Sequence, residues 1–89
     1  MVTLSLALTP LPGKTPEIIQ TIVALTAQVR THRGCVGFVH YIRDEGRSVE
    51  VVQEWFDRAA AESYLRSREH RALIGAAETL CRHHRLTIS

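Results

Sequence analysis

The sequence predicts an α+β fold with elements in the order β-α-β-β-α-β and with the second helix broken in two. Residues 2–8 and 48–56 alternate their large apolar side chains with a period of two, which indicates strands. Residues 15–30 repeat apolar side chains every three or four positions, which indicates a helix. This order is the split βαβ, or ferredoxin-like, arrangement, which gives an antiparallel four-stranded sheet with helices on one face.

The chain starts with a predicted strand followed by a predicted helix. The stretch TPLPG ends the first strand, because two prolines and a glycine interrupt regular structure. We expect Thr15 to be the N-cap of the helix and Pro16 to fill its first position, where the missing N–H would be unpaired anyway. The helix then presents one apolar stripe, formed by Ile18, Ile22, Leu25 and Val29.

Residues 35–43 and 48–56 predict a hairpin around the sequence DEGR, in which Gly46 is free to take a positive φ. On its second strand one face carries Val49, Val51, Gln53 and Trp55. The other face carries Glu50, Val52, Glu54 and Phe56. Neither face is purely polar, so we expect helices to cover one face and a partner to cover the other.

Two short helices and a strand complete the predicted chain. Asp57 can cap a helix over residues 58–65, and Ser67 can cap a helix over residues 68–80. The inner stripe of the longer helix is expected to be Ala72, Leu73, Ala76, Ala77 and Leu80. CRHH is expected at the solvated helix end, where positive side chains suit the C-terminal dipole. HRLTIS then predicts a final strand, with Leu86 and Ile88 on one face.

Length and composition indicate one domain, residues 1–89, that associates with a second copy of itself. A chain of 89 residues builds a thin core, yet 45% of its residues are hydrophobic, so a homodimer through the sheet face is expected. A net charge of +2 argues against a nucleic-acid partner. Without a signal peptide or an apolar run of about 18 residues, we expect no membrane contact and a cytoplasmic location. Cys35 and Cys81 would then be free thiols.

Three stretches, in the same order and at similar spacing, resemble the antibiotic-biosynthesis-monooxygenase family. They are LPGK after the first strand, RGCVGF at the start of the second strand, and EWFDRAAAESYLRSREHRAL after the third. Together they span nearly the whole chain. The resemblance implies a homodimer whose two sheets pack into a dimeric α/β barrel, with a pocket between sheet and helices in each subunit. Family members include cofactor-independent oxygenases of quinols and polycyclic phenols, heme-degrading enzymes and isomerases.

At two places the chain departs from the family pattern, and these departures bear on which of the family's functions are expected. Where the family commonly has the first His of an H-x-x-S-x-x-H run, this chain has Tyr64, and only the second His, His70, remains. The heme-degrading branch carries an Asn on the first strand and a His in the last helix. The corresponding residues here are Leu6 and Ile74, both aliphatic, so heme degradation is not expected.

The candidate site residues surround the end of the third strand. Trp55 and Phe38 are expected to shape a pocket for a planar aromatic substrate, although Trp55 could equally be a core ring. Tyr64 and His70 are the catalytic candidates, as hydrogen-bond donor to a phenolate and as acid or base, although His70 could instead tie the helix start to its surroundings.

Two polar residues complete the candidate set. His40 would face the pocket if the hairpin pairs symmetrically about DEGR, and a one-residue slip would turn it away. Gln53 shares the face of Trp55 and is either a pocket donor or a residue of the strand edge.

The predicted function is a cofactor-independent monooxygenase acting on a quinol or polycyclic phenol. No metal is expected, because the His and Cys spacing of CRHH matches no common zinc pattern. No phosphate loop or nucleophile elbow is present, and no organic cofactor is implied. The main alternative is a non-catalytic dimer that binds a small molecule or serves as an accessory subunit. An isomerase of the same fold is a third possibility.

Overall fold

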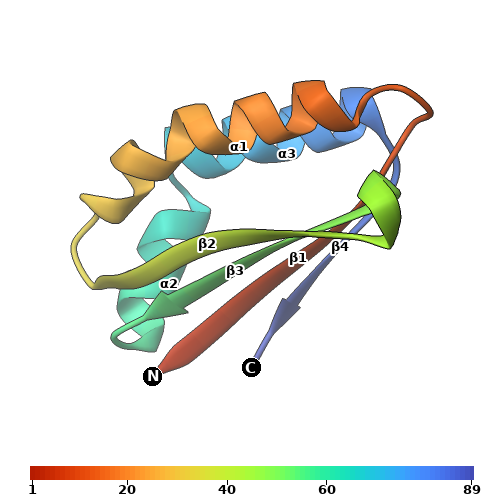
Figure 1. Ribbon diagram of the computed structural model, residues 1–89. Helices are drawn as coiled ribbons and strands as arrows, with labels where there is room; N and C mark the ends of the chain where they lie inside the picture. Colours follow the sequence, from red (N-terminus) through yellow and green to blue (C-terminus); the bar gives the residue numbers. More distant parts are fainter.

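The computed structural model describes residues 1–89 and confirms the predicted order of elements (Figure 1). The strands are β1 (Val2–Pro10), β2 (Cys35–Arg43), β3 (Ser48–Trp55) and β4 (Cys81–Ile88). The helices are α1 (Thr15–Arg30), α2 (Arg58–Leu65) and α3 (Arg68–Leu80), and a short 3₁₀ turn, η1 (Asp44–Gly46), joins β2 to β3. The protein is therefore an α+β, ferredoxin-like domain whose second helix is broken into α2 and α3.

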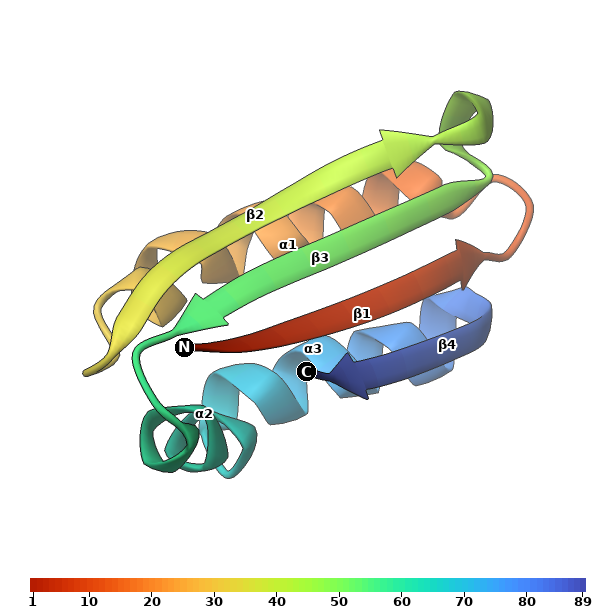
Figure 2. The same ribbon diagram turned by 90° about the horizontal axis from the view of Figure 1, so that it is seen from below.

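The four strands form one antiparallel sheet in the order β2-β3-β1-β4. Helices α1 and α3 lie side by side along one face of this sheet, and α2 sits at the end where β3 stops (Figure 1). Figure 2 shows the face of the sheet that points away from the helices. In this view the sheet lies in front of α1 and α3, and no element of the chain covers this open face. None of the three helices is long and apolar enough to cross a membrane.

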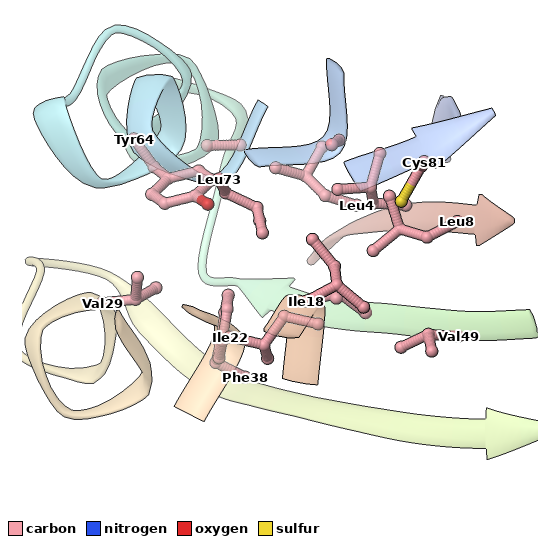
Figure 3. Packing of buried hydrophobic residues seen from close by; sticks show 14 of the residues in the cluster. Leu4, Leu8, Ile18, Ile22, Val29, Phe38, Val49, Tyr64, Leu73 and Cys81 are labelled. Carbon is pink, nitrogen blue, oxygen red and sulfur yellow. The ribbon is translucent and has the colours of Figure 1, made fainter. Parts of the chain in front are cut away.

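The core fills the space between the sheet and the two long helices (Figure 3). The alternation predicted for β1 and β3 is confirmed, because the even-numbered leucines of β1 and the odd-numbered residues of β3 are fully buried. The predicted stripe of α1 also faces the core, with Leu25 half-buried and its three other members fully buried. The largest buried side chains are Trp55, Tyr64 and Phe38.

The start of α1 differs from the prediction. Thr15 is the first residue of the helix rather than its N-cap, which is Lys14 and makes no side-chain capping bond. The Thr15 hydroxyl instead donates to the carbonyl oxygen of Gly46 at 2.5 Å. A tertiary hydrogen bond to the β2–β3 turn has therefore replaced the local cap. In that turn Gly46 takes the predicted positive φ, and Asp44 and Glu45 do so as well.

The junction of α3 and β4 also differs from the prediction. Strand β4 starts at Cys81, directly after the helix, so His83 and His84 belong to a strand and not to a solvated helix end. Pairing with β1 explains this, because Cys81 is already opposite Pro10 and a register shift follows at Thr9. In α3, Ala72 is exposed, whereas Leu73 and Ala77 form the buried part of the stripe.

A tight corner connects β3 to α2 and depends on Gly34. The φ of Gly34 is +85°, and a Cβ at this position would lie 2.5 Å from Cβ of Ala60 in α2. The backbone N–H of Phe56 donates to the Gly34 carbonyl at 2.7 Å. Gly34 therefore lets the first turn of α2 pack directly against the start of β2.

The open face of the sheet is chemically mixed. The Thr3 hydroxyl donates to the carboxylate of Glu54 at 2.9 Å, and the Ser5 hydroxyl donates to Glu50 at 2.9 Å. Beside these polar pairs, Val39 and Tyr41 on β2 leave 41% and 49% of their surface exposed. The open face thus combines exposed apolar side chains with paired carboxylates.

Candidate functional site: an aromatic cluster where β3 meets α2 and α3

Trp55 and Tyr64 form the centre of a buried cluster. Trp55 is the last residue of β3, and Tyr64 lies on the inner face of α2, so the corner at Gly34 brings the two rings together. Their ring centroids are 4.9 Å apart and their planes differ by 24°, which is a stacked arrangement. Both side chains are completely buried. Figure 3 shows Tyr64 lying against the core near Leu73 of α3.

Gln53 provides the polar contacts of this pair. The indole Nε1 of Trp55 donates to Oε1 of Gln53 at 3.1 Å, and Nε2 of Gln53 donates to the Tyr64 hydroxyl at a long 3.5 Å. Burial raises the pKa of Tyr64 to about 12, so its hydroxyl stays protonated throughout the neutral range. Tyr64 is therefore suited to donate a hydrogen bond and not to act as a base.

His70 also lies against Tyr64, as the break between α2 and α3 allows. The two ring centroids are 5.2 Å apart with an angle of 65° between the planes. The Ser67 hydroxyl accepts a hydrogen bond from the His70 backbone N–H, and this bond fixes the first turn of α3. Nδ1 of His70 is buried without a hydrogen-bond partner. Burial lowers the pKa of His70, so the imidazole is neutral at neutral pH and one ring nitrogen is free to accept a proton.

His32 and Glu69 also belong to this cluster, and the sequence did not point to them. The ring of His32 meets Trp55 and Tyr64 edge-on, at centroid distances of 6.4 Å and 5.9 Å. Its Nε2 lies 2.6 Å from Oε1 of Glu69, the residue before His70. This hydrogen bond lowers the pKa of Glu69. The only signal in the sequence was a His in the short THRG connection after α1, which matches no motif.

The remaining sequence candidates are Phe38 and His40, and both lie on β2. Phe38 is buried in the core opposite Gln53, which places it one strand away from the cluster. His40 is opposite Val51, so the symmetric pairing of the hairpin is confirmed and His40 is on the helix side of the sheet. It lines a hollow of about 470 Å³ between α1 and β2, and none of the cluster residues lines that hollow.

The centre of the cluster, formed by Trp55, Gln53 and Tyr64, is closed to solvent in this structure. The main hollows of the surface lie elsewhere, and the largest, of about 530 Å³, is lined by the β1–α1 loop and the β2–β3 turn. A hollow of about 280 Å³ between α1 and the start of α3 is lined in part by Glu69, but by none of Trp55, Gln53, Tyr64 and His70. The hollow that contains Phe56 and Ala60 is not lined by Trp55 or Tyr64 either. No three His, Cys, Asp or Glu side chains gather closely enough to hold a metal ion. What the cluster offers chemically is a flat aromatic pair, a protonated phenol and a neutral imidazole.

The fold and this cluster together define a small ferredoxin-like domain with an aromatic centre beneath its helices, and solved structures share the fold. Protein SO0527 from Shewanella oneidensis superposes with a TM-score of 0.91 at 20% identity, covering 99% of this chain and 87% of that one. PA3566 from Pseudomonas aeruginosa gives 0.86 at 21% identity, covering 99% and 90%. An antibiotic biosynthesis monooxygenase gives 0.87 at 14% identity, covering 100% and 96%. At these identities the likeness is one of fold.

The family follows from the sequence match. The family model described as antibiotic biosynthesis monooxygenase matches residues 1–76, which is most of the chain. The protein therefore belongs to the antibiotic biosynthesis monooxygenase family, as the three motifs indicated. A search of curated proteins found no significant match.

Proposed function

We propose that this protein is a monooxygenase that oxidises a quinol or a polycyclic phenol without a metal or an organic cofactor. The observation that carries the proposal is the position of Tyr64, whose ring stacks on Trp55 and also contacts a neutral His70 with an unpartnered Nδ1. Membership of a family named for monooxygenases supports it.

In this reaction the substrate itself supplies the electrons. His70 accepts the proton of a phenolic hydroxyl, and the resulting anion reduces O₂ at the ring carbon that becomes oxygenated. One oxygen atom stays on the ring and the other leaves as water, so a quinol becomes a hydroxyquinone with no external reductant. The protein must bind a planar ring, exclude water and stabilise negative charge on the substrate.

The residues of the cluster fit these tasks. Trp55 offers a flat face for stacking on the substrate ring, and the protonated Tyr64 hydroxyl donates to the phenolate oxygen. Gln53 holds both side chains through its amide and can exchange its long bond to Tyr64 for one to the substrate. His70 acts as the base, and its lowered pKa keeps it able to accept a proton at neutral and mildly acidic pH.

The experiment is a turnover assay with quinols, following O₂ consumption and quinone absorbance. We expect His70→Ala and Tyr64→Phe each to slow oxidation by about 10²-fold or more, the usual range for losing an acid–base group or a charge-stabilising donor. Glu62→Gln, an exposed change on α2, is the matched control and should leave the rate unchanged. Normal turnover in both cluster variants would show that the site has been assigned to the wrong residues.

We further propose that two chains associate through the open face, so that the two sheets form a barrel. The exposed Val39 and Tyr41 and the absence of any covering element on this face support the proposal. A charge at Tyr41 would then be buried without a partner, so Tyr41→Glu should convert dimers to monomers. Sedimentation at micromolar concentration measures this directly, and a monomeric wild-type protein would contradict it.

The second candidate function is a non-catalytic dimer that binds a small molecule or serves as an accessory subunit. The complete burial of Trp55, Gln53 and Tyr64 favours it, because these polar groups already satisfy one another. Binding of a quinol without O₂ consumption would identify this alternative.

A further inference from the structure

His32 and Glu69 form the outer layer of the aromatic cluster. Trp55 and Tyr64 are completely buried, whereas the His32 and Glu69 side chains are 26% and 16% exposed. His32 belongs to the connection between α1 and β2, and Glu69 to the first turn of α3. The pair thus joins two separate parts of the chain at the surface, directly over the two stacked rings.

We infer that the His32–Glu69 pair controls access to the aromatic cluster, and that a ligand enters between the α1–β2 connection and the start of α3. Three observations support this. The cluster is closed, so something must move before a molecule reaches Trp55. The ring of His32 contacts both Trp55 and Tyr64, so its displacement exposes both rings at once. The 2.6 Å contact to Glu69 is the one side-chain hydrogen bond of His32.

The charges around His32 favour this pairing. Glu69 on α3 is its single carboxylate partner. Tyr64 on α2, whose pKa burial raises, and Cys35 at the start of β2, whose pKa burial also raises, are both neutral at neutral pH. His70 is neutral as well, for the same reason of burial. Arg68 lies near Glu69, and its charge helps to keep that carboxylate ionised.

This inference concerns how a ligand enters the site of the proposed function, so its role in catalysis rests on that proposal. The access route itself is testable without a substrate. Trp55 is the only tryptophan of the chain, so its fluorescence reports on this cluster alone. Acrylamide quenches an indole only when it can approach the ring, so the quenching constant measures how often the cluster opens.

The experiment compares quenching of Trp55 in the wild type, His32→Gln, Glu69→Gln and the double variant. Glu69→Gln removes the charge of the acceptor and His32→Gln removes the imidazole donor, so each variant weakens the hydrogen bond. The open population, and with it the quenching constant, should rise by about tenfold in each single variant. The double variant should show no further increase, because both substitutions weaken the same contact. Glu62→Gln, which removes a carboxylate from an exposed pair on α2, should quench like the wild type.

The pH dependence adds a second readout that a purely structural role would not move. The lowered pKa of Glu69 means that the pair persists in mild acid and is lost as the pH falls through that pKa. Quenching of the wild type should therefore rise on acidification while circular dichroism still reports a folded protein, and quenching of Glu69→Gln should stay flat. Equal quenching in the wild type and both single variants would overturn the inference, whatever the enzyme does with quinols. A wild type that fails to consume O₂ would overturn the proposed function and leave the access route standing.

Discussion

Replacing Gly34 tests the corner between β3 and α2. A side chain at this position has two separate costs, one from the backbone conformation and one from the close packing against Ala60. In Gly34→Ala the alanine must adopt a positive φ of 85°, and its Cβ lies 2.5 Å from Cβ of Ala60. The φ costs about 1–2 kcal/mol for a residue with a Cβ, and the overpacking costs about 1–3 kcal/mol more. Gly34→Ala should therefore lower the free energy of unfolding by roughly 2–5 kcal/mol.

Gly13 supplies the matched control. Its φ is 78°, but a Cβ there would have nothing within 4 Å, so Gly13→Ala should cost only the conformational term of about 1–2 kcal/mol. Ala60→Gly removes the opposing methyl group and on its own costs about 1 kcal/mol of helix propensity. The loss in the double variant should be about 1–3 kcal/mol smaller than the sum of the two single losses, because the overpacking is gone.

Urea unfolding at one fixed protein concentration measures these differences, and thermal unfolding checks them, because each kcal/mol lowers Tm by about 4–8 °C in a domain of this size. If Gly34→Ala costs no more than Gly13→Ala, or if the losses of Gly34→Ala and Ala60→Gly simply add, the close packing of α2 on Gly34 is wrong. The position of Tyr64 over Trp55 would then need another explanation.

Two further predictions concern stability. Phe38→Ala should lower the free energy of unfolding by about 3–5 kcal/mol, because its ring is buried in the core, whereas Ile42→Ala on the exposed part of the same strand should change it by no more than ~0.5 kcal/mol; similar losses in the two variants of β2 would refute the burial argument. Hydrogen bonds from Ser5 and then from Arg43 lower the pKa of Glu50 in the folded protein, so the contribution of Glu50 to stability is present above the unfolded-state pKa and is lost as the pH falls through the folded-state pKa. Urea titrations between neutral and acidic pH should therefore show that the free energy of unfolding depends less on pH in Glu50→Gln than in the wild type. The same pH dependence in both proteins would contradict this role of Glu50.

Much of the fold could be predicted because it depends on local patterns. The alternation in β1 and β3 and the stripe of α1 are properties of consecutive residues, and the structure confirms their burial. The predictions failed where a distant segment decided the outcome. Thr15 bonds to Gly46 instead of capping its helix, and pairing with β1 draws Cys81 into a strand.

The candidate site shows the same division. Trp55, Gln53, Tyr64 and His70 lie within 20 residues, and the strand-to-helix corner brings them together as the sequence suggested. Phe38 and His40 remain predictions, and the structure places His40 in a separate hollow beside α1. His32 went unnoticed because its partner Glu69 is 37 residues away.

The sequence by itself determined the order of elements, the buried faces and the family, because periodicity and motif spacing are carried by neighbouring residues. Only the tertiary structure decided that the aromatic centre is closed and that His32 and Glu69 meet above it. These contacts form because the end of α1, the end of α2 and the start of α3 pack together. These segments are far apart in the sequence, so only the packing of the folded chain sets the contacts between them.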